Sequence, residues 1–409
     1  MTQQSAALVP RVLVAQLGAR RHYLVPGAFA GAGMLDLFLT DFYWKRKPGA
    51  ALFERAPALR AMRNRRSSAL DDTQVRSFPL FAIAYRRRVR AARTAGDRTR
   101  AWMWGGERFC ELAKPFLKSS PATIFAFTSA ARELFSAGRD RGMTLILDHA
   151  TAPRRHEMRL VAEEMQRFPG WARFAGKDDA IDDYHERQMA ETRLAHRVIC
   201  SSAFARDVLI EQGVATEKIR RVPLGLDGGF PAAMPPKQSS GPLRVLFVGG
   251  DGLRKGIGYL HEAVRLLRAP SIQVKVAGDL ELSEAGSTTL SRHLELLGPV
   301  ARAQVIDLYT WADVLVLPSI SDTFGLVVLE AMACGVPVIA SRNTCGPDVI
   351  RGGEDGFVVP IRDAAAIASC LDRLAGDRGL LLAMAESARQ RAGEFTSAQY
   401  CARLLAAIA

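Results

Sequence analysis

The chain contains 409 residues, of which 48% are hydrophobic and 24% charged, and its formal net charge at pH 7 is +13. This length allows two domains of roughly 150 to 200 residues, each with its own hydrophobic core. No apolar stretch reaches the roughly 18 residues that span a bilayer, and the first residues lack the basic segment that opens a signal peptide. We therefore expect a globular protein whose first apolar run is a strand.

The cysteines bear on the cellular compartment and on metal binding. Six cysteines lie far apart, without the CxxC spacing of metal and redox sites, at Cys110, Cys200, Cys334, Cys345, Cys370 and Cys401. This pattern predicts reduced thiols in a cytoplasmic protein, and neither a disulfide framework nor a metal site.

Positive charge is concentrated in residues 41–100, which hold 16 Lys and Arg against 5 Asp and Glu. Arginines alternate there with aromatic residues, as in YRRRVRAARTAGDRTRAWMW. Such a surface suits anionic lipid head groups or a nucleic acid, while an arginine-rich solvated face of ordinary helices is the plain alternative. No helix-turn-helix, zinc-finger or RNA-binding motif accompanies the charge, so we expect no nucleic acid partner.

Short apolar runs alternate with helical patterns through most of the chain, which indicates an α/β fold with parallel sheets. In the first half we expect strands at residues 11–17, 122–127, 144–150 and 197–202, with a last strand at 220–227. Residues 228–242 are rich in Pro, Gly and Ser and have no periodic apolar spacing. This composition indicates a linker.

The strand pattern starts again after the linker, at residues 243–250, 272–279, 313–319, 336–341 and 356–360. We therefore predict two doubly wound Rossmann-like domains, at residues 1–227 and 243–395, whose loops face each other across a ligand cleft. The last helix, at residues 396–409, is expected to pack back toward the N-terminal domain.

The segment FVGGDGLRKGIGYL follows a strand and opens a helix, a place where backbone N–H groups and the helix dipole attract an anion. Arg254 and Lys255 add two cations, so the segment suits a phosphate or a diphosphate. Gly250, Gly252 and Gly256 give GxGxxxG instead of GxGxxG, which makes a dinucleotide-dependent dehydrogenase a weak rival. A tight turn with two solvated basic side chains is the alternative.

The segment SDTFGLVVLEAMACGVPVIAS contains two carboxylates, Asp322 in a loop after a strand and Glu330 inside an apolar helix. A buried carboxylate is costly without hydrogen-bond donors, so Glu330 needs a partner. The two hydroxyls of a ribose or an arginine of the protein would serve equally well. At the helix start Phe324, Gly325 and Leu326 offer free N–H groups.

These residues resemble the acidic-x7-Glu signature of the retaining glycosyltransferases of family 4, which have the GT-B fold. Other stretches match that family in order: LAHRVICSSAFARDVLIEQGVATEKIRRVPLGLD, VLFVGG, RKGIGYLHEA, LYTWADVLVLPS and NTCGPDVIRGGEDGFVVPIRD. The likeness is nearly continuous from about residue 194 to 376 and thinner in the N-terminal half, where acceptors vary. It implies an N-terminal domain that binds the acceptor and a C-terminal domain that binds a nucleotide sugar.

The resemblance also implies roles for single residues. Glu330 matches the carboxylate that accepts hydrogen bonds from the nucleotide ribose, and Asp322 replaces the usual glutamate that meets hydroxyls of the donor sugar. Lys255 matches the lysine that neutralises the leaving diphosphate. The turn at residues 324–326 corresponds to the one whose amides contact the sugar and the distal phosphate.

Other positions depart from the family pattern. Where many members have an arginine after the first strand of this domain, Gly250 follows Gly249, so we assign the second cation to Arg254 and both glycines to donor binding. His149 matches the histidine that the family places near the donor sugar, although a structural role is the alternative for a lone histidine. Gly18 stands where the family has a glycine pair, and only one of the pair is present.

We therefore expect a hexosyltransferase that moves a sugar from a nucleoside diphosphate sugar to an acceptor hydroxyl with retention of configuration. The sequence contains no Asp-x-Asp triplet, so we expect Lys255 and Arg254 in place of a metal, and no cofactor. A role in envelope, capsule, lipopolysaccharide or exopolysaccharide synthesis would bring residues 41–100 to the inner leaflet of the plasma membrane. The alternatives are a nucleotide-sugar epimerase, a phosphorylase and a non-catalytic nucleic-acid-binding protein.

Overall fold

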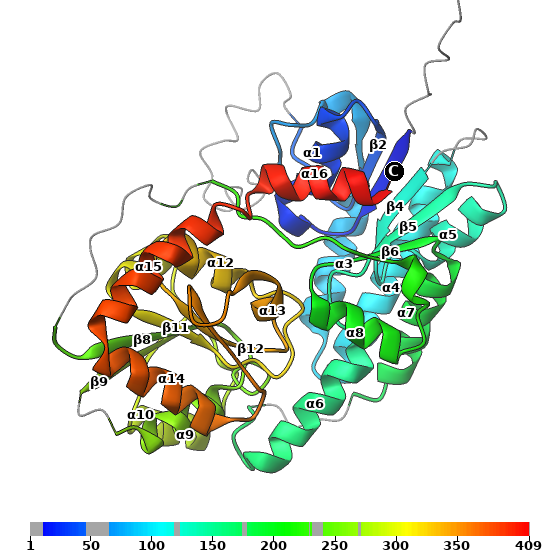
Figure 1. Cartoon of the computed structure of the whole chain (residues 1–409). Coiled ribbons are helices and arrows are strands. Elements are labelled where there is room, and N and C mark those ends of the chain that lie inside the picture. Colours follow the sequence, from blue (N-terminus) through cyan, green and yellow to red (C-terminus); the bar gives the residue numbers. More distant parts are fainter. Residues whose placement is uncertain are drawn as a thin grey trace, which may run out of the picture.

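The computed structural model describes residues 11–45, 65–117, 123–173, 178–228, 230, 240–268 and 271–408. Figure 1 shows two α/β halves, each a twisted sheet with helices packed against it. The strand pairings of both sheets are parallel. The predicted class of two doubly wound Rossmann-like sheets is confirmed.

The sheet of the first half has the strand order β3-β2-β1-β4-β5-β6-β7. Its strands are β1 (Val12–Gln16), β2 (Leu35–Thr40), β3 (Val75–Ser77), β4 (Thr123–Phe127), β5 (Thr144–Asp148), β6 (Arg197–Cys200) and β7 (Ile219–Arg221). The direction of chain order reverses between β1 and β4. In such sheets ligands bind outside the carboxyl ends of the strands at this switch point.

The helices of the first half cover both faces of that sheet. The α-helices are α1 (Leu24–Gly31), α3 (Pro79–Ala91), α4 (Ala95–Ala113), α5 (Arg132–Arg139), α6 (Arg154–Arg167), α7 (Ile181–Leu194) and α8 (Ala203–Glu211). Short 3-10 turns are η1 (Arg20–Tyr23), η3 (Asp72–Gln74), η4 (Lys114–Phe116) and η5 (Thr216–Lys218).

The sheet of the second half has the order β10-β9-β8-β11-β12-β13, with its switch point between β8 and β11. Its strands are β8 (Leu243–Val248), β9 (Ile272–Ala277), β10 (Glu295–Gly298), β11 (Val314–Leu317), β12 (Val338–Ser341) and β13 (Gly356–Val359). The helices are α9 (Ile257–Leu266), α10 (Glu284–Ser291), α11 (Arg302–Trp311), α12 (Leu326–Ala333), α13 (Gly346–Val349), α14 (Ala364–Gly376), α15 (Arg378–Ala392) and α16 (Ser397–Ile408). Within the described ranges, no helix is long and apolar enough to cross a membrane.

The structure contains three strands that the sequence did not predict, β2, β3 and β10. In β2 the charged Asp36 interrupts the apolar run, and its carboxylate pairs with Arg11 at 2.7 Å. β3 is only three residues long and two of them are polar, and β10 has no fully buried residue. The strand expected at residues 220–227 is also shorter in the structure than predicted: it corresponds to β7, which ends at Arg221.

The residues of β1 show how the core is layered. All five are buried, as expected for a parallel sheet that is covered on both faces. Val14 packs in one cluster with Leu404 of α16, whereas Leu13 packs in another with Phe109 of α4. Since burying one such side chain contributes about 1.5–3 kcal/mol, the last helix of the chain is part of the core of the first half.

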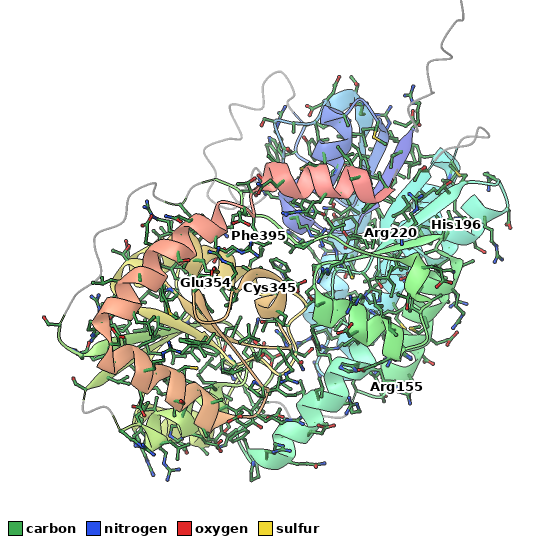
Figure 2. All side chains as sticks on the ribbon, in the orientation of Figure 1. Arg155, His196, Arg220, Cys345, Glu354 and Phe395 are labelled. Carbon is green, nitrogen blue, oxygen red and sulfur yellow. The ribbon has the colours of Figure 1, made fainter. Side chains whose placement is uncertain are left out.

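The chain crosses between the halves at two neighbouring places. The backbone of Leu226 donates to Phe395 O at 2.8 Å and accepts from the N–H of Ser397 at 2.9 Å. Phe395 is labelled in Figure 2 where the second half ends. After it α16 lies beside α1 (Figure 1), with Tyr400 buried. Residues 229 and 231–239 of the predicted linker lie outside the described residues.

Helix α6 joins the two halves at another place. Near its end the buried carboxylate of Glu164 accepts hydrogen bonds from Arg362 Nε and from the Tyr259 hydroxyl, each at 2.6 Å. Just past the helix, the ring of Phe168 lies so close to Gly258 that an added Cβ would come within 2.3 Å of it. α6 therefore connects the loop after β5 with the first helix of the second half.

Candidate active site

Gly256 fixes the loop that follows β8. It has φ +73° and caps α9, and a Cβ at this position would lie 2.1 Å from Pro318 O, just after β11. Only glycine adopts this conformation at no steric cost. The loop is therefore held against the carboxyl end of the neighbouring strand, at the switch point of the second sheet.

The backbone amides of this loop are largely engaged within the protein. The N–H groups of Gly249, Asp251 and Gly252 donate to the carbonyls of residues 277, 279 and 280 over 2.8–3.0 Å. Lys255 and Gly256 donate to carbonyls of the loop itself. An incoming anion would consequently depend more on the side chains of the loop than on its amides. The sequence analysis, in contrast, expected the backbone N–H groups to bind the anion together with the two cations.

The side chains of Lys255 and Asp322 form an ion pair in the structure. Oδ1 of Asp322 also accepts a hydrogen bond of 3.4 Å from the backbone of Phe324. Gly325 has φ +75°, and a Cβ there would lie 2.9 Å from Oδ2 of Asp322. The cation and the first carboxylate predicted from the sequence are therefore neighbours at the carboxyl ends of β8 and β11.

Arg254 is bound both by the loop after β8 and by the loop after β11. Its Nε lies 2.7 Å from Asp251, and its NH1 donates to Ser321 O at 2.8 Å. Burial alone would lower the pKa of the guanidinium, but the carboxylates of Glu157, Asp251 and Asp322 raise it. Glu157 belongs to α6 of the first half, with its carboxylate 4.0 Å from Arg254 Nε. Arg254 therefore stands between the two halves.

The turn at residues 324–326 contacts the rest of the protein on two sides. Phe324 is buried and its carbonyl accepts from the backbone of Cys345 at 2.9 Å, whereas Leu326 is exposed. Just before the turn, Thr323 reaches the first half: its hydroxyl donates to Ala150 O at 3.3 Å. The turn thus lies where the carboxyl-end loops of the two sheets meet.

Glu330 lies on α12 and already has protein partners. Its Oε2 accepts from the Tyr309 hydroxyl at 3.0 Å, and its Oε1 is 3.6 Å from Arg302, whose side chain is 81% exposed. Burial and the charge of Glu330 raise the pKa of Tyr309. An exposed ion pair contributes at most about 1 kcal/mol, so Oε1 is only weakly satisfied.

Glu330 also lines a cavity of 320 Å³. The other lining residues come from the end of β8, from α11 and from the segment before it, and from the crossing between the halves; they are Gly228, Phe230, Val248, Val300, Arg302, Val305, Ile306 and Tyr309. The cavity is apolar apart from Glu330, Arg302 and Tyr309. Within the described part of the chain, Glu330 forms no hydrogen bond or ion pair with Lys255 or Asp322, which lie in the loops after β8 and β11.

His149 follows β5 directly and is buried. Its Nδ1 lies 2.5 Å from Thr151 O, and because a carbonyl only accepts, Nδ1 must carry the proton. Nε2 is buried and has no hydrogen-bond partner among the described residues. Burial lowers the pKa of the imidazole to about 4. His149 is therefore neutral at pH 7, with an unused acceptor one residue from the contact with Thr323.

Gly18 lies in the first half, directly after β1. It has φ +86°, and its N–H donates to Asp41 at 3.0 Å. Gly18 lines a second cavity, of 360 Å³, at the carboxyl ends of β1 and β4. Glu157 lines the same cavity, so this hollow reaches the carboxylate that approaches Arg254. Gly18 forms no hydrogen bond with the residues of the second half that the structure describes.

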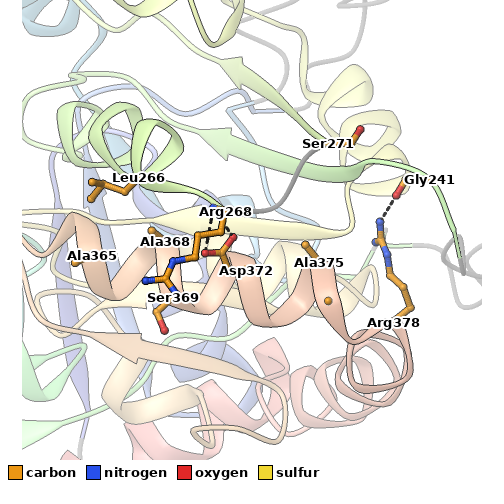
Figure 3. A pocket seen from close by; sticks show the side chains of 11 residues that line it. Gly241, Leu266, Arg268, Ser271, Ala365, Ala368, Ser369, Asp372, Ala375 and Arg378 are labelled. Carbon is orange, nitrogen blue, oxygen red and sulfur yellow. Dashed lines mark hydrogen bonds between the residues drawn. The ribbon is translucent and has the colours of Figure 1, made fainter.

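A larger hollow, of 760 Å³, lies away from these residues and is drawn in Figure 3. It runs between the end of α9 and α14, where Arg268 meets Asp372 and Arg378 meets Gly241 O. It includes none of the residues predicted for the site. Because it lies beside the amino ends of β8 and β9, it is not where a doubly wound sheet usually binds its ligand.

Some residues of the site were missed by the sequence analysis. Tyr309 and Arg302 meet Glu330 from α11, and Glu157 meets Arg254 from the other half of the chain. Tyr309 lies in LYTWADVLVLPS, a stretch that matches the family but to which the sequence analysis gave no role, whereas Arg302 and Glu157 lie outside the stretches that match. Across the described ranges, no group of three or more His, Cys, Asp or Glu side chains could hold a metal ion.

The second half matches the family model of the Glycosyl transferases group 1 over residues 233–391. The D-inositol 3-phosphate glycosyltransferase of Corynebacterium jeikeium (strain K411) is 29% identical over 314 residues, which are 68% of this chain and 74% of that protein. Three further proteins of that name match over only 21–32% of their own length.

Solved structures resemble the whole chain. The sucrose-phosphate synthase of Thermosynechococcus elongatus has a TM-score of 0.60 at 19% identity, with 97% of this chain and 98% of that chain covered. HepE (Alr3699) of Anabaena, solved in complex with UDP, has a TM-score of 0.61 at 14% identity, with 97% and 99% covered. At such identities the likeness concerns the fold.

Proposed function

We propose that this chain, whose second half matches the group 1 glycosyl transferases and which has the GT-B fold, transfers a sugar from a nucleoside diphosphate sugar to an acceptor hydroxyl with retention of anomeric configuration. The observation that carries this proposal is the pairing of Lys255 with Asp322 at the switch point of the second sheet, beside the cavity of Glu330. The solved HepE complex contains UDP at a related fold, which supports a nucleotide donor.

The nucleoside is proposed to occupy the cavity at Glu330. Its apolar wall, which includes Val248, Val300 and Val305, suits the face of a base. Because Tyr309 holds Oε2 of Glu330, the weakly satisfied Oε1 remains to accept hydrogen bonds from the ribose hydroxyls. Hydrogen bonds to a charged group contribute about 1.5–3 kcal/mol, enough to orient the ribose.

The diphosphate is proposed to lie against Lys255 and Arg254. As the bond from the sugar to the phosphate breaks, negative charge grows on the leaving group, and cations fixed in advance stabilise it most at that moment. Arg254 is already oriented by Asp251 and Ser321. No metal ion is required in this proposal, since the two side chains supply the positive charge.

The donor sugar is proposed to lie between Asp322 and His149. Asp322 accepts from sugar hydroxyls, and the unused Nε2 of the neutral His149 accepts from another. For retention, the acceptor oxygen attacks the face from which the diphosphate departs; the bond from the sugar carbon to the leaving oxygen breaks, and the leaving phosphate takes the acceptor proton. This step uses no nucleophile of the protein.

The first half is proposed to face an anionic membrane surface, with a lipid-linked or growing envelope glycan as acceptor. Residues 46–64 of the basic segment lie outside the described residues, but α3 is described. Leu80 is 84% and Ile83 51% exposed, and Arg87 and Arg90 extend the same exposed face at helical spacing. Apolar and cationic side chains on one helix face suit an anionic bilayer surface.

The donor proposal is tested by thermal-shift titration of the wild type, Glu330→Ala and Glu354→Ala with a panel of nucleoside diphosphates and their sugars. Glu354 is an exposed glutamate of the same half, labelled in Figure 2, and serves as the control. A ligand at 100 times its dissociation constant stabilises a protein by about 2.7 kcal/mol. We expect one nucleotide to shift the wild type and Glu354→Ala but not Glu330→Ala. No shift of the folded wild type with any nucleotide would refute the proposal.

The membrane proposal is tested by sedimentation with vesicles of neutral and of anionic lipid. We expect the wild type to bind the anionic vesicles at low salt, and the double variant Leu80→Ser with Ile83→Ser to bind them less. Equal binding to both kinds of vesicle would overturn it.

A further inference from the structure

The cavity of 360 Å³ in the first half combines aromatic and charged side chains. Tyr85, Trp102 and Tyr184 supply ring faces, and Arg20 and Arg154 supply two guanidinium groups. The cavity lies at the switch point between β1 and β4, where a doubly wound sheet binds its ligand. Ring faces of this kind suit the apolar face of a sugar or of a cyclic polyol, while charged groups select its substituents.

The two carboxylates of the cavity already have cationic partners. Asp41 accepts two hydrogen bonds from Arg65, at 2.9 and 2.6 Å, and a third from the N–H of Gly18. Glu157 pairs with Arg154 at 2.5 Å and lies 4.0 Å from Arg254. The carboxylates therefore do not leave the cavity with a net negative charge.

The two arginines, in contrast, retain donors for a ligand. Arg20 forms no ion pair within the part of the chain that the structure describes, and its guanidinium lies 5.7 Å from the ring centre of Phe127. The guanidinium of Arg154 lies 5.7 Å from the ring centre of Trp102, and its buried Nε has no hydrogen-bond acceptor among the described residues. A guanidinium held on a ring keeps its planar set of N–H groups oriented, which suits the paired oxygens of a carboxylate or a phosphate.

The wall of the cavity after β4 is rigid. Ser129 has φ +79°, which is uncommon for a residue other than glycine, and its N–H donates to the buried carboxylate of Glu191 at 2.6 Å. The N–H of Ala131 donates to the same carboxylate at 2.9 Å. Gly106 leaves room for this loop, since a Cβ there would lie 1.8 Å from Ser129 O. Strained backbone that a buried network maintains is concentrated at binding sites.

We propose that this cavity binds the acceptor and that Arg20 and Arg154 select an acceptor with an anionic group, a phosphate or a carboxylate, on a sugar or polyol ring. This inference rests on the proposed function, since it names the second substrate of the same reaction. Glu157 connects the cavity to Arg254, so an acceptor held here lies next to the proposed donor phosphate. The anionic group stays bound to the arginines while a ring hydroxyl of the acceptor reacts.

The test is isothermal titration of the full chain, with and without the nucleoside diphosphate that it binds. The probes are glucose 6-phosphate, glucuronate, neutral glucose and inorganic phosphate. The variants are Arg20→Gln, Arg154→Gln and Arg154→Lys. The control is Arg155→Gln, because Arg155 is the next residue of α6, labelled in Figure 2, and points outward to pair with Asp182 with its side chain 61% exposed.

We expect at least one anionic sugar to bind about tenfold or more tightly than glucose, the factor that one hydrogen bond to a charged group supplies. Each Gln variant should lose this preference, Arg154→Lys should keep part of it, and Arg155→Gln should keep all of it. The preferred probe identifies the anion as phosphate or carboxylate. Inorganic phosphate alone should bind more weakly than the phosphorylated sugar.

Two results would overturn the inference: equal affinity for glucose and both anionic sugars, or an equal loss in Arg155→Gln and Arg154→Gln. Binding of the nucleoside diphosphate is measured in the same experiments and should be unchanged in all variants. If the nucleotide binds and no anionic sugar does, the inference fails and the proposed donor site stands. If anionic sugars bind through the arginines and no nucleotide binds, the proposed function fails instead.

Discussion

Lys255 and Asp322 stand 67 positions apart and form an ion pair between the loop after β8 and the loop after β11. Both side chains are mostly buried, with 13% and 12% exposed. A diphosphate at this place offers a second anion to the same ammonium group and competes with Asp322 for it. In the proposed reaction, donor binding therefore draws Lys255 to the phosphate and frees Asp322 to accept from the sugar hydroxyls.

Replacing Asp322 by Asn removes the competing charge and keeps the size of the side chain. We expect Asp322→Asn to bind the nucleoside diphosphate at least as tightly as the wild type, because no carboxylate holds Lys255. The corresponding nucleotide sugar should lose its advantage over the diphosphate, because a neutral amide accepts hydroxyl hydrogen bonds less strongly than a carboxylate. Isothermal titration measures both affinities. A large loss of diphosphate affinity in a folded variant would contradict this reading of the pair.

The buried contact between α6 and the second half predicts that substitutions of two adjacent glutamates lower the free energy of unfolding by different amounts. Glu164→Gln removes a fully buried charge that Arg362 and Tyr259 require, and breaking such a contact costs about 3 kcal/mol. Glu163→Gln is the control, because Glu163 pairs with the same arginine near the surface, where the cost is below about 1 kcal/mol. Urea unfolding measures the free energies of unfolding. Equal losses in the two variants would show that burial of Glu164 is unimportant.

Two glycines with positive φ allow the cost of backbone strain to be measured apart from the cost of a steric clash. Gly353 has φ +86° and open space around its Cβ position, so Gly353→Ala should cost only the strain, about 1–2 kcal/mol. Gly256→Ala adds a contact of 2.1 Å with Pro318 O and displaces the loop that carries Lys255. Thermal unfolding should show a larger loss for Gly256→Ala, and its nucleotide binding should fall while that of Gly353→Ala is retained. Unchanged nucleotide binding in Gly256→Ala would contradict the proposed position of the donor.

The buried imidazole of His149 predicts a pH dependence of stability. Burial lowers its pKa to about 4 in the folded protein, from an ordinary value near 6.5. Between these values the unfolded chain binds a proton that the folded protein excludes, so the free energy of unfolding rises with pH through this window and levels off above it. The effect of this one group between pH 7 and 4 is about 3 kcal/mol.

Denaturant unfolding of the wild type and His149→Gln at several pH values between 4 and 7 measures that slope. The variant should have the shallower slope. The slope that remains comes from the other groups that titrate between pH 4 and 7, among them His156, His185 and His261, whose pKa values burial also lowers. An identical slope in both proteins would mean that His149 is not held neutral in the folded state.

The second half was largely predictable because its signals are local. β8, β11 and β12 are predominantly apolar runs, and Lys255 and Asp322 lie directly in the loops that follow two of them. In a doubly wound sheet, loops after adjacent strands at the switch point meet. The sequence alone therefore sufficed to assign these two side chains to the same site.

The first half was less predictable because its contacts join distant segments. Glu164 and Arg362 are 198 positions apart, and each lies in a segment of ordinary charged composition. Arg20, Trp102 and Arg154 come from three elements and share no motif, so no sequence spacing indicates that they line one cavity. The left-handed backbone of Ser129 has no sequence signal either, since it depends on Glu191 of α7.

The role of Lys255 in holding a diphosphate is tested most directly by isothermal titration of the wild type and Lys255→Gln with the bound nucleoside diphosphate and with the matching nucleoside. We expect the variant to lose about tenfold or more in affinity for the diphosphate, which corresponds to one hydrogen bond between charged groups. Its affinity for the nucleoside should be unchanged, because the nucleoside is proposed to lie at Glu330 and not at Lys255. Equal affinity of the wild type and Lys255→Gln for the diphosphate would contradict the proposed donor site.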